Sequence, residues 1–469
     1  MRKNKRSNAI LPIVVLLMVV QLSTAQTKNA FSVKQAVDYG LKNAVQVKNA
    51  LIDIKIQEQT NREITAAAFP QINGSITTVH YFNVPVQSIP NFISPATYKV
   101  LKDEGVKNGS GNTITSPNGG NFGNLPLQFG TPWTTSAGLD FSQLLFDGQV
   151  FVGLQARTAA MELATKSAEV TAEQIKANIY KIYYQLVVGN SQLASLEANI
   201  VRFKKLLLDT REIYKNGFAE KLDVDKLVVQ LNNLSTEKEK VMNQLTAGNT
   251  GLKFLMSMPQ KEELVLTDSL TEEELKSNIL EENVNYTDRK EIQLFTLAAK
   301  MNSYNVKRYN LSRIPTVAAI GSYSKNAQRN TFNFFDKGDW FTTSLIGLKI
   351  AVPIFDGFAR RSKIASAKLT LEKSNNSLQQ AKESMDNEVI QARIKMKSAI
   401  LTADAQKQNI QLAEDVFRIT QKKYAEGLGS NQEIYNAQTE LKVAQNNYYG
   451  ALYDAISAKI DYLKAAGKL

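Results

Sequence analysis

The chain contains one pattern twice, and this duplication limits the possible folds more than any other feature. Residues 145–148 read Leu-Phe-Asp-Gly, and residues 354–357 read Ile-Phe-Asp-Gly, 209 positions later. The pattern Tyr-x-x-Gly follows each of them, at 214–217 and again at 424–427. A repeat of this kind indicates two copies of one structural unit. We therefore interpret the chain as a duplication.

Each copy has the pattern of a helix, a strand, a loop, a second strand, a very long helix, a tight turn and a returning helix. The first helices, over roughly 31–67 and 284–313, stop just before Pro70 and Pro315, because proline cannot continue a helix. The first copy carries extra residues at 83–132. That segment is rich in Gly, Asn and Pro and predicts a long loop.

We expect four segments along the chain. Residues 1–25 have the basic start, the short apolar stretch and the small residues of a cleaved secretory signal, and an uncleaved anchor is the alternative. Residues 26–258 form the first copy and residues 287–469 the second. The acidic residues 259–286 connect the copies, and we place them on the outside of the shaft that the long helices form.

Strands in both copies separate apolar from polar residues, because side chains alternate between the two faces of a strand. In the segment 133–145 one face carries Trp133, Thr135, Ala137, Leu139 and Phe141, and the other carries Thr134, Ser136, Gly138, Asp140 and Ser142. The same parity in the second copy gives Trp340, Ile346, Leu348, Ile350 and Val352, against Thr343, Gly347 and Lys349. We expect β-strands between lipid and a watery lumen, with Trp133 and Trp340 at the membrane interface. A soluble sheet packed on a core is the alternative.

Four strands cannot close a barrel, and an open sheet edge cannot face lipid. The chain is therefore expected to oligomerise. Two copies would give eight strands, whose interior side chains fill, whereas three copies would give twelve and leave room for a pore. The geometry favours a trimer if the barrel conducts.

Two segments without proline, 148–215 and 357–424, predict helices about 100 Å long. Asp147 and Asp356 precede them in the position of an N-cap, where a carboxylate accepts backbone N–H groups and opposes the helix dipole. The helical pattern resumes at 221–256 and 430–466 after each Tyr-x-x-Gly, so each copy ends in an antiparallel hairpin.

The first long helix carries an apolar seam with the spacing of a coiled coil, and Gly189 is its missed step. The seam consists of Ile175, Ile179, Ile182, Leu186, Leu193, Leu196, Ile200, Phe203 and Leu207. A weaker seam in the second copy consists of Ile410, Ala413, Phe417, Thr420 and Tyr424. Both predict packing against partner helices.

Composition argues against several functions. The chain has no cysteine and a single histidine, His80, so a metal centre or a histidine-based catalytic triad is not expected. Its formal charge is +12, but the lysines are spread among acidic and amide residues rather than clustered with aromatic ones, so we expect no nucleic-acid binding. No nucleotide-binding motif occurs, and no cofactor is expected.

Phe-Asp-Gly after a strand, Tyr-x-x-Gly before a returning helix, and the duplication itself resemble the TolC-like outer-membrane efflux proteins. The resemblance covers essentially the whole mature chain. It implies a mainly α-helical fold with a membrane β-barrel, in which each protomer of a homotrimer contributes four strands to a shared barrel of twelve. It also implies that the helical hairpins form an α-barrel tunnel in the periplasm.

The resemblance further implies passive conduction of substrate, with a periplasmic adaptor protein, an inner-membrane transporter and outer-membrane lipid as partners. The family is not one of enzymes, and it implies no catalytic residue. The exported substrate stays open. A structural or adhesive coiled-coil surface protein without conduction is the main alternative, and a periplasmic enzyme is the second.

Family resemblance also implies two groups of site residues. The hairpin tips that would contact the adaptor carry Tyr214, Gly217, Phe218, Tyr424, Gly427 and Leu428. The acidic tunnel constriction of the family falls on Glu433 and on Asn436, and the second of these departs from the acidic pattern and predicts a weaker anionic ring. Asp223 and Asp225 in the neighbouring hairpin are further constriction candidates, with ordinary solvated helix surface as the alternative.

Overall fold

The computed structural model describes residues 28–269 and 289–469. The expected signal segment, 1–25, lies outside these residues, as does the larger part of the expected acidic connection, 270–286. The described part of the chain contains no helix that is apolar over the length needed to cross a membrane.

The chain divides into two compact units, which we describe separately. Among the described residues, the helical unit comprises 28–60, 156–269, 289–305 and 366–469. The sheet unit comprises Asn61–Gln155 and Val306–Ala365. Both units therefore draw on both sequence copies.

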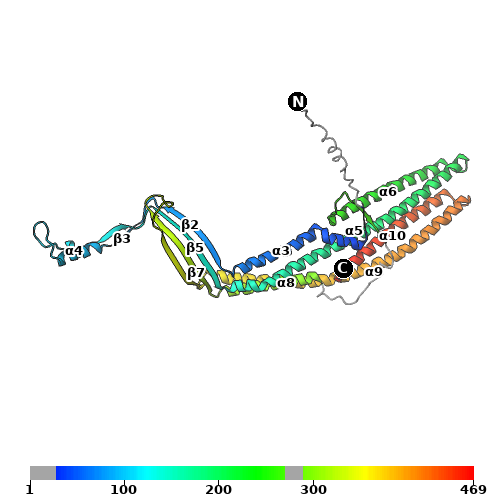
Figure 1. Cartoon of the computed structure of the whole chain (residues 1–469). Helices are drawn as coiled ribbons and strands as arrows, with labels where there is room; N and C mark the ends of the chain where they lie inside the picture. The colour runs from blue at the N-terminus through cyan, green and yellow to red at the C-terminus, as the bar shows by residue number, and fades with distance from the viewer. Residues whose placement is uncertain (1–27, 270–288) are drawn as a thin grey trace, which may run out of the picture. The chain divides into compact units, whose positions relative to one another are not determined.

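The sheet unit is built on four antiparallel strands in the order β2-β5-β7-β8 (Figure 1). Their bounds are Gln71–His80 for β2, Trp133–Phe146 for β5, Thr316–Arg329 for β7 and Phe341–Ala351 for β8. Among the described residues no further strand lies beside β2 or β8, so both are edge strands. We call the end of the sheet at which β2 and β7 finish, and β5 and β8 begin, its loop end.

The strand register joins the apolar residues of the two copies into one face. Phe141 pairs with Ile72 on one side and Gly321 on the other, and Gly321 pairs with Ile346. Residues paired across strands point to the same face of a sheet. This face therefore carries Ile72, Ile76, Leu139, Phe141, Tyr323, Ile346, Leu348 and Ile350, all exposed in the single chain. Lys325 is a charged residue of this face, close to the loop end.

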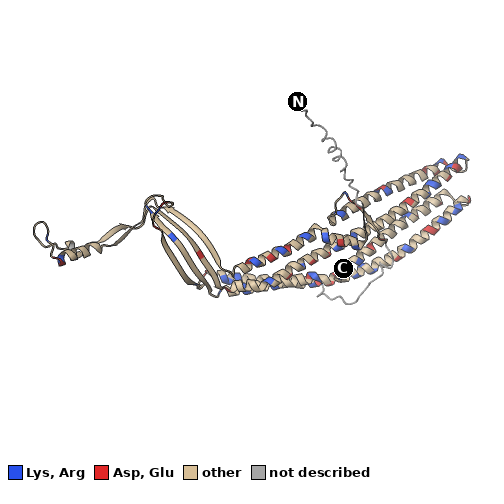
Figure 2. Cartoon of the chain, viewed as in Figure 1, with Lys and Arg blue, Asp and Glu red and all other residues tan. Residues whose placement is uncertain are grey.

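The opposite face of the sheet is mainly polar. It carries Asn73, Ser75, Thr134, Ser136, Asp140, Ser322, Ser324 and Lys349. Figure 2 shows few charged residues on the sheet and many along the helices. The sheet thus has the two unlike faces that the alternation predicts.

The prediction of a plain loop at 83–132 is wrong. Strand β3, Val86–Pro90, pairs antiparallel with β4, Asn124–Gln128, and helix α4, Ile93–Asp103, lies between them in the chain. A short 3₁₀ helix covers Pro117–Gly120. The Gly, Asn and Pro content hid these elements, because a two-stranded ribbon consists only of edges, where proline is tolerated.

The prediction of one first helix over 31–67 is also wrong. Helix α2 spans Val33–Asn43 and α3 spans Val45–Ala66, and Ala44 between them has the non-helical angles φ −54° and ψ 128°. The N–H of Val45, which starts α3, donates to the Ser257 side chain over 3.1 Å. The break is therefore stabilised by a residue more than 200 positions away, which local sequence cannot reveal.

The remaining helices repeat in length as well as in order. Helix α3 and helix α8, Lys290–Leu311, both have 22 residues. Helix α6, Lys221–Leu255, and helix α10, Asn431–Ala465, both have 35. The long helices are α5, Gly148–Lys215, with 68 residues and α9, Ala359–Ala425, with 67.

A short parallel ribbon pairs β1, Lys28–Phe31, with β6, Glu263–Leu266. It is held to the helices by Tyr183, which is fully buried. The Tyr183 hydroxyl donates to the Phe31 carbonyl over 2.8 Å and accepts from the Asp268 N–H over 3.2 Å. The described start of the expected connection, 259–269, therefore packs through β6 beside β1.

The apolar seam of α5 packs against α6 in the helical unit, and Gly189 in this seam faces a leucine of α6. A Cβ atom at Gly189 would lie 2.8 Å from Leu245 Cδ2, and one at Gly248 would lie 2.8 Å from Leu186 Cδ2. Helix α6 thus places a leucine over the glycine of α5, and α5 places a leucine over the glycine of α6. The missed heptad step at 189 is the hole that receives Leu245.

Gly189→Leu tests this exchange, because it completes the heptad pattern yet fills a site already occupied. We expect a loss of about 1–3 kcal/mol in the free energy of unfolding from overpacking, measured by denaturant unfolding in detergent. Gly251→Leu is the control, since a Cβ there meets no atom within 4 Å. Equal stability of the two variants would contradict the packing described.

Candidate functional site: the tips of the two helical hairpins

The first hairpin tip is a glycine turn between α5 and α6. Gly217 has φ +79°, in the left-handed region that favours glycine. Its N–H donates to the Tyr214 carbonyl over 2.9 Å, and the Phe218 N–H donates to the Ile213 carbonyl over 3.0 Å. These bonds satisfy the last carbonyls of α5 and reverse the chain.

The second tip, between α9 and α10, repeats this geometry. Gly427 has φ +73°. Its N–H donates to the Tyr424 carbonyl over 3.0 Å, and the Leu428 N–H donates to the Lys423 carbonyl over 2.9 Å. Both Tyr-x-x-Gly motifs therefore form the same turn.

The side chains of the tips differ in exposure. Phe218 is 86% exposed and Leu428 is 77% exposed, whereas Tyr214 is half-exposed. Tyr424 is partly buried, and its hydroxyl shares a 3.2 Å hydrogen bond with Thr210 Oγ1 of α5. Each tip thus presents one large apolar side chain directly after its glycine.

Two further hydrogen bonds join the hairpins near their tips. Asn431 Nδ2 donates to the Asp223 carbonyl over 3.2 Å, and Lys226 Nζ donates to Gln432 Oε1 over 3.2 Å. They connect the first two turns of α6 with the first turn of α10. The sequence analysis missed Thr210, Asn431 and Gln432, because nothing in the chain order indicates which helices are neighbours.

Of the constriction candidates, Asp223 and Asp225 lie near the start of α6, whereas Glu433 and Asn436 lie near the start of α10. Asp223 accepts the Glu220 N–H over 3.3 Å and so caps α6, whereas Asp225 is exposed. Across the described residues, no three His, Asp or Glu side chains converge as a metal site requires.

On α10, Glu433 and Asn436 lie on one exposed face. The Glu433 N–H donates to the Ser430 hydroxyl over 3.2 Å, and Asn436 Oδ1 accepts from Gln432 Nε2 over 2.9 Å. Glu440 is exposed seven positions after Glu433 and continues this face. The sequence analysis missed Glu440, although its helical spacing was a usable signal.

The aspartates of the two Phe-Asp-Gly motifs differ in how they accept hydrogen bonds from the helix that follows. Asp147 Oδ1 accepts the N–H groups of Gln149, over 2.7 Å, and Val150, over 3.3 Å, at the start of α5. Asp356 accepts the Arg360 N–H over 3.0 Å, but α9 begins only at Ala359.

Asp356 therefore lies two residues before Phe358, the residue that directly precedes α9, and the expectation that Asp356 occupies the N-cap position is wrong. Gly357 and Phe358 both have positive φ angles, +63° and +66°, which delay the helix. The identical motif did not reveal this difference, because backbone angles in the second copy depart from those in the first.

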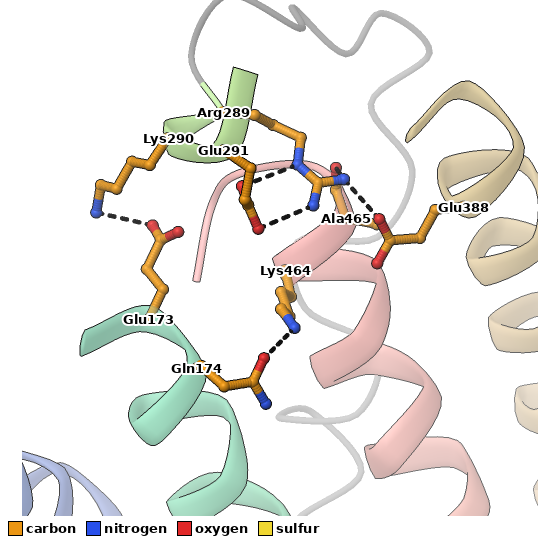
Figure 3. Close-up of polar contacts among 8 residues, drawn as sticks. All are labelled: Glu173, Gln174, Arg289, Lys290, Glu291, Glu388, Lys464 and Ala465. Carbon is orange, nitrogen blue, oxygen red and sulfur yellow. Dashed lines mark hydrogen bonds and ion pairs between the residues drawn. The ribbon is translucent and has the colours of Figure 1, made fainter. Parts of the chain in front are cut away.

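A buried arginine, which the sequence analysis did not single out, joins helices elsewhere in the helical unit (Figure 3). Arg289 is 3% exposed. Its Nη1 donates to Glu388 Oε2 of α9 over 2.8 Å and to the Ala465 carbonyl at the end of α10 over 3.3 Å. Its Nη2 donates to Glu291 Oε1 over 3.2 Å.

Two neighbouring contacts extend this Arg289 cluster to α5. Lys290 pairs with Glu173 over 2.8 Å, and Lys464 Nζ donates to Gln174 Oε1 over 2.6 Å (Figure 3). The cluster therefore ties the start of α8 to α5, α9 and α10. Its groups pair with one another, so we interpret the cluster as a structural clamp.

Charges in the clamp stabilise each other. Burial alone would raise the pKa of Glu291, but the hydrogen bond and positive charge of Arg289 outweigh burial and lower it. Burial alone would lower the pKa of Arg289, but its two carboxylate partners raise it. Both groups are therefore charged at neutral pH.

Sequence comparison finds a matching family and a similar protein. Residues 293–468 match the family described as outer membrane efflux protein. The alkaline protease secretion protein AprF of Pseudomonas aeruginosa is 20% identical over 341 residues, which cover 71% of this chain and 68% of AprF.

Solved structures share the fold. The outer membrane protein VceC from Vibrio cholerae matches with a TM-score of 0.68 at 15% identity, over 93% of this chain and 96% of VceC. The Campylobacter jejuni CmeC outer membrane channel matches with a TM-score of 0.72 at 17% identity, over 93% of this chain and 85% of CmeC. The likeness extends over both units.

Acid should weaken the clamp. Because the pKa of Glu291 is lowered on folding, its contribution is present above the ordinary glutamate pKa and is lost as pH falls through the lowered value. We expect Glu291→Gln to cost about 1.5–3 kcal/mol at pH 7 and less at low pH, measured as thermal unfolding by circular dichroism.

The control is Glu212→Gln, which removes a surface pair with Lys215 in which both side chains are about two-thirds exposed. Such pairs contribute little, so we expect almost no change in that variant. A Glu291→Gln variant as stable as the control at neutral pH would contradict the clamp.

Proposed function

Since this chain is a TolC-like outer membrane efflux protein, located in the outer membrane, we propose that it is the exit channel of a tripartite export or secretion system. The family is one of outer membrane channel proteins rather than enzymes. In this proposal three copies form one passive channel. The observation that carries it is a sheet with one apolar face and two edge strands.

The sheet edges require completion in a membrane. Backbone N–H and C=O groups without partners are costly in lipid, so β2 and β8 need further strands beside them. A neighbouring copy supplies these by pairing its β8 with β2. Three copies give twelve strands, with the face of Leu139 and Ile346 toward lipid and the face of Asp140 toward a watery interior.

The long hairpins supply the second part of the channel. Charged residues are distributed along their helices, as Figure 2 shows. Such surfaces suit a water-filled lumen rather than a dry core. In the proposed trimer, the hairpins of three copies line an α-helical tunnel in the periplasm, through which substrate diffuses.

The hairpin tips are the proposed docking site for a periplasmic adaptor protein, which an inner-membrane transporter accompanies. Phe218 and Leu428 are large apolar side chains that lack cover at the two tips, as a docking surface requires. The bond between Thr210 and Tyr424 holds the hairpins together, so opening would have to break it. Energy comes from the transporter, and no cofactor is needed.

The proposed constriction is formed by the α10 face that carries Glu433 and Asn436, with Asp223 and Asp225 on the neighbouring hairpin. Three copies bring three Glu433 carboxylates around one axis. Like charges in a narrow passage attract multivalent cations. The neutral Asn436 makes this ring weaker than two acidic layers would be.

Single-channel recording in planar bilayers tests the proposal. We expect the purified protein to conduct and to be blocked by multivalent cations. Replacing the carboxylate, Glu433→Gln, should raise the half-blocking cation concentration by about tenfold, which corresponds to ~1.4 kcal/mol.

Glu104→Gln, an exposed acid in the segment 83–132, is the control and should leave blockage unchanged. Conduction with unaltered blockage in Glu433→Gln would reject the constriction alone. A protein that carries no current at all would reject the channel and favour a structural surface protein.

A further inference from the structure

A continuous row of aromatic rings crosses the loop end of the sheet. The His80 ring lies 4.8 Å from Phe82 and 4.2 Å from Trp133, centroid to centroid. Trp133 lies 5.0 Å from Phe332, which lies 5.6 Å from Phe334.

Two more rings complete this aromatic row. Phe335 lies 6.3 Å from Phe332, and Trp340 lies 6.3 Å from Phe334. The spacings between the phenylalanine and tryptophan rings of this row are within the range in which aromatic rings attract each other.

The aromatic row runs from one edge strand to the other. His80 is the last residue of β2, and Trp133, its partner in the register, is the first residue of β5. The other end lies in the connection between β7 and β8, with Trp340 directly before β8. A single chain therefore carries aromatic rings at both open edges of its sheet.

Exposure within the aromatic row increases toward Phe82 and Phe335. Phe334 is 9% exposed, and both tryptophans are partly buried. Phe82 is 91% exposed and Phe335 is 93% exposed. Two phenylalanines without cover at these places indicate a contact that the single chain does not make.

We propose that the aromatic row is an interaction surface for a second copy of this chain, with Phe82 of one copy packing against the Phe335 and Trp340 end of the next. The inference rests on the proposed trimeric barrel. There, β8 of one copy adjoins β2 of its neighbour with antiparallel alternation preserved. The loop ends of the two strands then coincide, and three rows close into one aromatic belt that clasps the outer end of the barrel.

Membrane lipid is the other possible cover, and the residue types argue against it. Rings at a lipid headgroup boundary use a polar atom, such as the tryptophan N–H, to reach water. In this row the tryptophans are the partly covered members, whereas the most exposed members are phenylalanines, which have no polar atom. Packing against aromatic side chains of another copy fits phenylalanine better.

The absence of cysteine from the chain allows a clean cross-linking test. We would co-express full-length Phe82→Cys with one affinity tag and full-length Phe335→Cys with another, then add a short bismaleimide linker to outer membranes. The expected product is a covalent dimer that carries both tags. Phe92→Cys with Phe335→Cys is the control, because Phe92 is 63% exposed and lies in the segment 83–132, which follows Phe82, but is outside the aromatic row.

Native mass spectrometry would establish whether the variants form a trimer. The proposed contact between copies is overturned if they do, and the Phe82 pair nevertheless cross-links no better than the Phe92 pair. Absence of any trimer would overturn the proposed contact together with the proposed channel. Failure of the contact alone is therefore distinguishable from failure of the channel.

A second measurement needs no cysteine. Phe82→Ala combined with Phe335→Ala should lower the temperature at which the trimer dissociates in detergent, whereas Phe92→Ala should not. An unchanged dissociation temperature in the double variant would assign the exposed rings to lipid and overturn the proposed contact between copies.

Discussion

The unpaired edges of β2 and β8 are the constraint on which the other features depend. A four-stranded sheet with an apolar face exposed on the single chain is incomplete in water and in lipid, since water disfavours the face and lipid disfavours the edges. In the proposed channel, neighbouring copies satisfy both. In that channel the duplicated helices follow the same symmetry as the strands.

The helical unit shows how the two helices of the first hairpin pack against each other. The exchange of Leu245 over Gly189 and Leu186 over Gly248 brings α5 and α6 close together along the seam. Glycine in a helix interior is costly by itself, and the close approach of the facing leucine compensates for that cost. The same pairing explains why a strict heptad pattern is interrupted without loss of contact.

The two copies differ where each returning helix ends. In the first copy, Ser257 with φ +55° follows α6 and its side chain holds the start of α3 beside the small Ala44. At the equivalent positions of the second copy, Gly467 with φ +70° follows α10 and lies against the large Arg289. The contact in the first copy thus involves small, neutral residues, whereas the contact in the second copy is part of the charged clamp. Duplication has conserved the backbone turn while the side chains have diverged.

From the sequence alone came the duplication, the long helices, the two glycine turns and the alternating strands, because each depends on local periodicity or on a residue with special backbone freedom. The break at Ala44, the ribbon inside 83–132, the delayed start of α9 and the contacts of Thr210, Asn431 and Arg289 came only from the tertiary structure. These features depend on residues that are distant in the chain, or on backbone angles that an identical motif leaves open. Local pattern therefore determined the elements, and packing between distant segments decided how they are joined.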